Sequence, residues 1–205
     1  MSDRIYCYPN SDVLINHLNI RNPDSDVLMN KLNIHDAEKL QEAERKLTML
    51  RLIDLLDRPV VGKFDFKHLQ TIHKYIFQDI YPWAGKVRSV DIAKSNMFCK
   101  VQFIETQADE IFGKLKNDCY LEGLPKEKFA KKAAYYFSEI NALHPFREGN
   151  GRTQREFIRQ LAYQSGYILH FSAISEQEMV QASIDSFVCN YKKMEALFIK
   201  IIKER

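Results

Sequence analysis

Apolar residues recur at helical spacing along most of the chain. Between Ala37 and about Arg58 they follow Asp36, which can cap the first free amide groups of a helix. The members of this apolar set are Leu40, Ala43, Leu47, Leu50 and Ile53. The spacing predicts a helix with these residues on one face. A second helix is predicted from Asp65 to near Ile80, and its apolar face consists of Leu69, Ile72, Ile76 and Phe77.

The same spacing returns in the second half of the chain. It predicts helices from about Glu105 to Leu115, from Pro125 to about Ala142, and from Arg152 to Ser165. Ser175 and Glu178 form a capping box, which predicts the start of a further helix. A last helix is predicted from the apolar residues Phe187, Tyr191, Met194, Leu197, Phe198 and Ile201.

The segment between Lys86 and Phe103 breaks the helical pattern. Its text, KVRSVDIAKSNMFCKVQF, is rich in Val, Ile and Phe, alternates in part, and has Lys94-Ser95-Asn96 in its middle. These features are typical of a short β-hairpin, and no other segment carries a strand signal. The sequence therefore predicts an all-α fold, a helical bundle with one small β-hairpin.

The N-terminal segment contains a tandem duplication of 14 residues. PNSDVLINHLNIRN, residues 9–22, is followed directly by PDSDVLMNKLNIHD, residues 23–36. This unit is too short for a solenoid repeat, so we interpret it as a local duplication with one copy beside the first long helix. The other copy is expected to be loosely attached, since termini tolerate change, and a binding role is the alternative. The expected organisation is an N-terminal segment, 1–36, followed by one domain, 37–205.

Composition limits the possible functions. With 205 residues, 45% hydrophobic and 28% charged, the chain fits a single globular domain. Lys and Arg number 30 against 27 Asp and Glu, and no dense basic run appears, so direct nucleic-acid binding is not expected. No signal peptide or membrane-spanning apolar run is recognisable, which makes a reducing cytosol the expected location.

The cysteines do not suggest a metal site. They are far apart, contain no CxxC pair, and no HExxH motif accompanies them; their positions are Cys7, Cys99, Cys119 and Cys189. A zinc site is therefore not expected, and the thiols are interpreted as small core side chains.

The stretch HPFREGNGRTQR carries most of the candidate chemistry. Pro145 disfavours helical geometry at His144, so this stretch is predicted to be a loop whose second half enters a helix N-terminus. Gly149, Asn150 and Gly151 let the backbone turn tightly and leave successive N–H groups facing one concavity. Such an arrangement binds anions.

Charged side chains flank these glycines. Arg152 and Arg155 lie in the first helical turn, where two cations oppose the helix dipole unless an anion lies between them. Phosphate oxygens match the planar forks of both guanidinium groups. Glu148 is a suitable Mg²⁺ ligand, and His144 can accept a proton near neutral pH. Together they predict attack by a hydroxyl on a nucleotide phosphate; idle surface ion pairs are the alternative.

The loop resembles the Fic motif, HxFx(D/E)GNGRxxR. The matching residues are His144, Phe146, Glu148, Gly149, Asn150, Gly151, Arg152 and Arg155. The segments YPWAGKVRSVDIAKS and YPNSDVL…NKLNI are similar to Fic proteins as well, so the resemblance covers nearly the whole chain. It implies the Fic fold, an all-helical domain with a β-hairpin flap at about 87–103 and a catalytic loop at 144–155.

The resemblance also implies an activity, the transfer of AMP from ATP·Mg²⁺ to a Ser, Thr or Tyr hydroxyl of a target protein with release of pyrophosphate. By the family pattern His144 is the general base and Glu148 binds Mg²⁺ between the α- and β-phosphates. The backbone of residues 149–151 forms the anion hole. Arg152 holds the β-phosphate and Arg155 the γ-phosphate region.

Two further roles follow from the resemblance. Phe146 is expected to anchor the loop in the core. The flap is expected to pair its edge with an extended target segment through Asp91, Ile92, Ala93, Lys94 and Phe98, with ordinary packing as the alternative for Phe98. Type II topoisomerases such as DNA gyrase are the family targets for cytoplasmic bacterial toxins, and small GTPases are those for effectors secreted into a host cell. Nothing in the sequence chooses between them.

Several alternatives stay open. Doc kinases carry Lys at the position of Gly151, so kinase chemistry is not expected, but UTP, GTP or CDP-choline could replace ATP. A catalytically idle interaction module and an AMP-removing enzyme are further alternatives. The intact motif counts against the idle module, and the remover needs an inhibitory glutamate that the sequence does not show.

Self-inhibition in the family depends on a helix bearing (S/T)xxxE(G/N), whose glutamate pairs with the second motif arginine. Ser172 and Glu176 have the spacing, but Gln177 follows; Ser186 is followed by Asn190 at the glutamate position. We therefore expect weak or absent self-inhibition, and a small separate antitoxin that carries this motif.

Overall fold

The computed structural model describes residues 27–93 and 97–205. Their helices are α1 (Ala37–Asp57), α2 (Phe66–Phe77), α3 (Ile104–Asn117), α4 (Lys126–Leu143), α5 (Asn150–Gln164), α6 (Glu176–Ser186) and α7 (Lys192–Ile201). Short 3₁₀ turns η3 (Val101–Phe103), η4 (Cys119–Leu121) and η5 (Phe171–Ala173) connect them. The all-α prediction is confirmed. The last helix begins later than predicted, because the chain makes a tight turn after α6 in which Cys189 has a positive φ of 58°.

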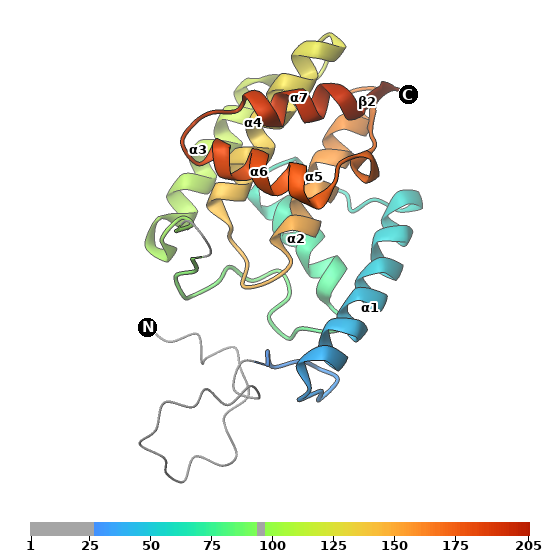
Figure 1. The fold of residues 1–205 in the computed structure, drawn as a ribbon, viewed down its shortest axis with the longest axis vertical. Helices are drawn as coiled ribbons and strands as arrows, with labels where there is room; N and C mark the ends of the chain where they lie inside the picture. The colour runs from blue at the N-terminus through green and yellow to red at the C-terminus, as the bar shows by residue number, and fades with distance from the viewer. Residues whose placement is uncertain (1–26, 94–96) are drawn as a thin grey trace.

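The helices pack around α4, which contacts α3, α5 and α7. α2 packs against α5 on one side and α1 on the other. Figure 1 shows α6 and α7 covering the end of the molecule where the chain terminates, and α1 beside α2 toward the opposite end. The apolar residues of α4 at helical spacing are buried and include Phe129, Ala133, Phe137 and Ile140. Among the described residues, no helix is long and apolar enough to cross a membrane.

Two short strands lie where the sequence predicted none. β1 (Tyr167–Leu169) pairs antiparallel with β2 (Ile202–Glu204), so that Tyr167 lies opposite Glu204. Each strand has three residues, which is too short for an alternating pattern to be recognised. The prediction that the only strands lie at 86–103 is therefore wrong.

The flap is an irregular turn. Its described residues contain one isolated antiparallel bridge, between Ala93 and Met97, and Phe98 N–H donates to the Ile92 carbonyl at 3.2 Å. The predicted hairpin is present as this single bridge and not as two ladder-forming strands, because backbone bonds leave the segment, as where Cys99 N–H donates to a carbonyl of α4. Lys94 lies outside the described residues.

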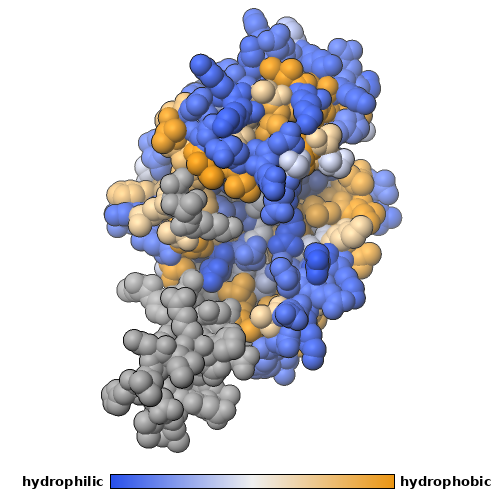
Figure 2. Space-filling view, in the orientation of Figure 1, coloured by the Kyte–Doolittle hydropathy of each residue, from blue (hydrophilic) through white to orange (hydrophobic). Residues whose placement is uncertain are grey.

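α1 turns an unexpected face toward the core. Its buried residues are Leu40, Thr48 and Leu55. Leu50 and Ile53, which the apolar spacing placed with Leu40, are 63% and 51% exposed. Figure 2 shows apolar side chains at the surface over the C-terminal half of α1. Polar residues therefore help to set the orientation of this helix.

The cysteine prediction is also wrong for the described residues. Cys119 and Cys189 are exposed and Cys99 is half-buried, because all three lie in turns and connections rather than on buried helix faces. Cys7 lies outside the described residues.

The second copy of the duplication leads into α1. Val27 is buried, and the Asn30 side chain closes a turn by donating to the Leu28 and Ile34 carbonyls at 3.0 and 2.8 Å. Lys31 N–H donates to the carbonyl of Ile80 at 2.7 Å. The first copy lies outside the described residues, and the division at residue 36 stays a prediction.

Candidate functional site

The loop at 144–155 joins α4 to α5 through two left-handed residues. His144 ends α4 with a φ of 45°, and Gly149 caps α5 with a φ of 82°. A Cβ atom on Gly149 would lie 2.1 Å from Cζ of Phe77, so a larger residue does not fit there. α5 begins at Asn150, two residues earlier than the predicted start at Arg152.

The start of α5 offers free backbone donors. The first intrahelical bond runs from Thr153 N–H to the Gly149 carbonyl at 3.1 Å. The N–H groups of Asn150, Gly151 and Arg152 precede it and have no helical acceptor. Helix N-terminal N–H groups attract anions, and the helix dipole adds to that attraction.

The side chains of the loop fasten it to the core. Phe146 is 1% exposed, and its ring stacks on that of His73 with 3.9 Å between centroids. The Asn150 side chain closes the loop, because Oδ1 accepts from Phe146 N–H at 2.9 Å and Nδ2 donates to the Phe146 carbonyl at 2.7 Å. The buried Phe146 ring thus packs the loop against α2, and the Asn150 side chain holds the loop backbone together by bonding both backbone groups of Phe146.

His73 supports the loop from α2. Gly85 N–H donates to Nδ1 at 2.7 Å, so the proton of a neutral ring lies on Nε2, which is 3.0 Å from the carbonyl oxygen of Glu148. Burial lowers the pKa of His73 to about 4; the hydrogen bond to Glu148 opposes this shift, and the charge of Arg152 adds to it. His73 is therefore neutral near pH 7.

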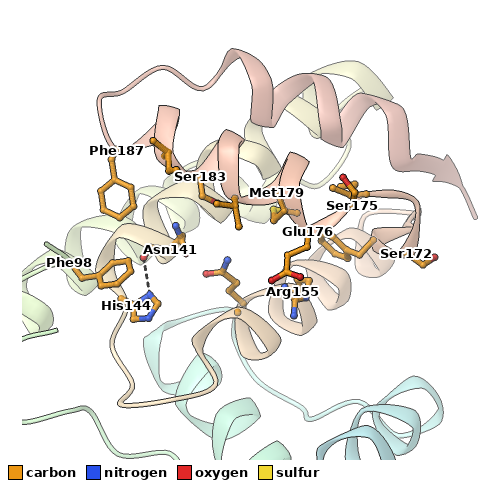
Figure 3. Close-up of a pocket in the computed structure, with 16 residues that line it drawn as sticks. Phe98, Asn141, His144, Arg155, Ser172, Ser175, Glu176, Met179, Ser183 and Phe187 are labelled. Carbon is orange, nitrogen blue, oxygen red and sulfur yellow. Dashed lines mark hydrogen bonds between the residues drawn. The ribbon is translucent and has the colours of Figure 1, made fainter. Parts of the chain in front are cut away.

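His144 faces a cavity at the end of α4. Its Nδ1 lies 3.3 Å from the carbonyl oxygen of Asn141, and its ring stacks on Phe98 with 3.7 Å between centroids (Figure 3). The buried guanidinium of Arg88 donates from Nε to the His144 carbonyl at 2.8 Å and from NH1 to the Val90 carbonyl at 2.6 Å. Arg88 thereby connects the base of the flap to the loop at 144–155.

The two motif arginines differ in their surroundings. The Arg152 NH2 group lies 2.5 Å from Glu44 Oε1 and 3.5 Å from Glu148 Oε1. Arg155 has no ion pair within the described part of the chain, and burial, together with the charge of Arg152, lowers the pKa of its guanidinium. A half-buried cation without a carboxylate partner favours a bound anion.

Two hollows meet at this loop. The first, of about 650 Å³, is lined by His144, Gly151, Arg155 and Phe98, and by apolar residues of α6 such as Met179 and Ile184 (Figure 3). The second, of about 600 Å³, lies beside α1 and is lined by Glu148 and Arg152 among others. Asp91, Ile92 and Ala93 line neither. Of the predicted site residues, four thus line the first hollow, whereas Glu148 and Arg152 line the second.

Comparisons with known proteins agree with these observations. The profile of the Fic/DOC family matches residues 63–162. The chain is 37% identical to the "Probable protein adenylyltransferase Fic" of Escherichia coli, over 97% of this chain and 92% of that protein. It is 43% identical to the protein adenylyltransferase VbhT of Bartonella schoenbuchensis, but spans only 39% of that relative. The chain belongs to the Fic/DOC family.

Solved Fic domains share the fold. The N-terminal Fic domain of a Bartonella quintana effector with bound ADP superposes with a TM-score of 0.87 at 29% identity, covering 98% of this chain and 95% of that one. BepC of Bartonella tribocorum with bound AMPPNP gives a TM-score of 0.86 at 25% identity, covering 98% of both chains. The fold of this Fic chain is therefore that of the nucleotide-bound effector domains.

Sequence reasoning missed three residues of this Fic site. His73 follows Leu69 by one helical turn on the apolar face of α2, which was a usable signal for a buried histidine. Arg88, a cation in a segment rich in Val, Ile and Phe, gave a weaker signal. Glu44 gave none, because its partner Arg152 lies 108 residues away in sequence.

The buried His73 predicts a pH dependence of stability. Its pKa in the folded state is about 4, below the unfolded value of about 6.5, so the unfolded chain binds more protons between these values. The free energy of unfolding is therefore expected to fall as the pH drops from about 6.5 toward 4, by up to about 3 kcal/mol. The measurement is urea unfolding at several pH values for the wild type and His73→Gln. A pH profile that this substitution leaves unchanged would contradict the assignment.

Proposed function

We propose that this Fic domain transfers AMP from ATP to a hydroxyl group of a target protein and releases pyrophosphate. The main support is that His144, Gly151 and Arg155 line one cavity, and that the N–H group of Gly151, in the first turn of α5, has no helical acceptor. The names of the relatives and the ADP and AMPPNP bound to the solved domains support an adenine nucleotide as donor.

The geometry around His144 suits a general base. A neutral imidazole that donates from Nδ1 to the Asn141 carbonyl keeps the lone pair of Nε2 for the proton of the target hydroxyl. The hydroxyl oxygen then bonds to the α-phosphorus, and the bond to the bridging oxygen breaks as pyrophosphate leaves. Phe98 holds the imidazole plane by stacking, and the N–H groups of α5 stabilise the charge on the phosphate.

The roles of the charged residues are those of the family pattern. By that pattern Arg155, an unpaired cation at the cavity of His144, would hold the γ-phosphate region, and Arg152, at the other hollow, would hold the β-phosphate. Glu148 suits Mg²⁺: its carboxylate is 46% exposed, and Mg²⁺ usually takes one or two carboxylates and completes its shell with phosphates and water. The described residues contain no cluster of three metal-binding side chains, which agrees with an ion shared with the nucleotide. When bound there, Mg²⁺ would neutralise part of the negative charge of the phosphates.

Replacement of Glu148 by Gln is expected to raise the Mg²⁺ concentration needed for half-maximal transfer by about tenfold or more, because the carboxylate that would hold the ion loses its charge. The measurement is a Mg²⁺ titration of the initial rate. Glu127→Gln is the control, since Glu127 pairs with Lys131 on the exposed surface of α4. Equal midpoints for wild type and Glu148→Gln would refute the assignment.

The flap suits a target segment. Asp91 and Ala93 are exposed and Ile92 is half-buried, beside Phe98 at the cavity. We infer that this edge, with Lys94, pairs with an extended strand of the target. The target is a type II topoisomerase if the chain acts in the bacterial cytoplasm, or a small GTPase if it acts as an effector in a host cell.

Glu176 lies near Arg155, and its position bears on whether the chain inhibits itself or is inhibited by a separate antitoxin. This residue lines the same cavity as Arg155, but no ion pair joins the two (Figure 3). We therefore infer that the chain does not inhibit itself strongly, and that a small protein carrying (S/T)xxxE(G/N) supplies the glutamate. Purified chain alone should show auto-transfer of AMP without any activating substitution.

The test of this function uses ATP labelled at the α-phosphate, Mg²⁺ and a bacterial extract, with purified gyrase and a small GTPase in parallel. The wild type should label a protein, and His144→Ala should not. No transfer from any nucleotide would favour an idle interaction module. Loss of AMP from a target that already carries it would favour the remover.

A further inference from the structure

α1 places a carboxylate against the catalytic loop. Glu44 has a side chain that is only 12% exposed, and its Oε1 lies 2.5 Å from the NH2 group of Arg152. One helical turn further along α1, Thr48 Oγ1 accepts from NH1 of the same guanidinium at 3.1 Å. The phosphate-binding arginine of the motif is therefore held from outside the motif.

We propose that Glu44 is a positioning residue, which orients the guanidinium of Arg152 toward the β-phosphate of the nucleotide. This inference rests on the proposed function. A guanidinium carries five N–H donors in a rigid plane. Glu44 and Thr48 engage two of them, and the plane lies over the Phe77 ring at 4.8 Å. NH2 also lies 3.5 Å from Glu148 Oε1, and no hydrogen bond to a described residue uses the other donors, so they can bind an anion while the side chain is already ordered before the nucleotide binds.

Glu44 is itself held in place. The buried hydroxyl of Tyr81 donates to Oε2, and the Thr48 hydroxyl donates to the Glu44 carbonyl at 2.7 Å. Burial, and then the charge of Glu44, raises the pKa of Tyr81, so its hydroxyl keeps the proton that it donates. Each carboxylate oxygen therefore has a partner, and the network leaves Glu44 little freedom to leave Arg152.

The orientation of α1 supports the same conclusion. The helix directs Glu44 and Thr48 inward while Leu50 and Ile53 remain more than half exposed. Apolar burial alone would favour the opposite orientation. The contacts of Glu44 and Thr48 with Arg152 therefore contribute to the orientation of α1, and they couple this helix to the phosphate site.

Glu44 could instead compete with the nucleotide for Arg152, and its removal would then change nucleotide affinity in the opposite direction. A carboxylate that competes with phosphate for Arg152 would weaken nucleotide binding, so its removal would strengthen it. Positioning predicts weaker binding after removal, and only for ligands that contain a β-phosphate. ADP and AMP differ by this one group, which makes the pair a direct probe.

The experiment measures the dissociation constants of ADP and AMP by calorimetry, with Mg²⁺, for the wild type, Glu44→Ala, Glu44→Gln, Arg152→Ala and the Glu44→Ala/Arg152→Ala double variant. Glu42→Ala is the control, because Glu42 is an exposed α1 residue paired with Lys46. Glu44→Ala should weaken ADP binding by about tenfold and leave AMP binding within about twofold. Glu44→Gln keeps an oxygen acceptor and should recover most of the loss.

In the Arg152→Ala background, Glu44→Ala should cause no further loss, because its effect passes through Arg152. Unchanged or tighter ADP binding by Glu44→Ala would overturn the inference, and so would equal losses for AMP and ADP. These binding constants do not depend on turnover. The proposed function is tested by the transfer assay instead, and it fails if the wild-type chain transfers no AMP.

Discussion

Replacement of His144 by Ala is expected to reduce the rate of AMP transfer by about 10²- to 10⁴-fold, the usual contribution of a general base. The imidazole is oriented by the Asn141 carbonyl and by the Phe98 ring, and alanine offers no proton acceptor in its place. ATP affinity should change little, because the free N–H groups of α5 and Arg155 remain. Initial rates with α-labelled ATP measure the effect.

His170 provides the matched control, since it is an exposed histidine that does not line the cavity. His170→Ala should transfer AMP at the wild-type rate. A His144→Ala rate within tenfold of the wild type, with unchanged folding, would exclude His144 as the base.

Replacement of Phe146 by Ala is expected to lower the free energy of unfolding by about 3–5 kcal/mol, as for other large-to-small core substitutions. The ring is 1% exposed and stacks on His73, so its removal leaves a cavity beneath the catalytic loop. Transfer should slow as well, because His144 is only two residues away in the chain. Urea unfolding measures the first effect and initial rates the second.

Two controls separate packing from general damage. Phe146→Leu keeps most of the volume and should cost less than about 1.5 kcal/mol. Phe103→Ala removes a ring that is 50% exposed and should change the free energy of unfolding by no more than about 0.5 kcal/mol. A loss below about 1 kcal/mol for Phe146→Ala would contradict the anchoring role.

The helices could be predicted because their apolar residues recur with the period of a helix. The helix α1 was predicted, but its buried face was not: the inward face includes Glu44 and Thr48, while Leu50 is exposed. An apolar pattern cannot reveal such a face, since its partner Arg152 lies far along the chain. In the flap the predicted hairpin is reduced to one bridge among the described residues, because the Cys99 N–H donates to α4 and the Val90 and Cys99 carbonyls accept from the Arg88 guanidinium.

Within the site, the loop could be predicted from its own residues, since Pro145 and Gly149 act locally on the backbone. The supporting residues could not. His73 and Arg88 reach the loop only after the helices pack, and neither belongs to the motif. Local chemistry therefore identifies the site, and tertiary contacts supply the parts that orient it.

If the loop at 144–155 directs a hydroxyl to the α-phosphate of ATP, the two ends of the nucleotide have different fates. Purified chain is incubated with Mg²⁺ and ATP labelled at the α-phosphate or, separately, at the γ-phosphate. We expect the α label to become covalently attached to protein and the γ label to be released in pyrophosphate in equal amount. Attachment of the γ label to protein, or hydrolysis of ATP without attachment of the α label, would show that the loop does not carry out AMP transfer.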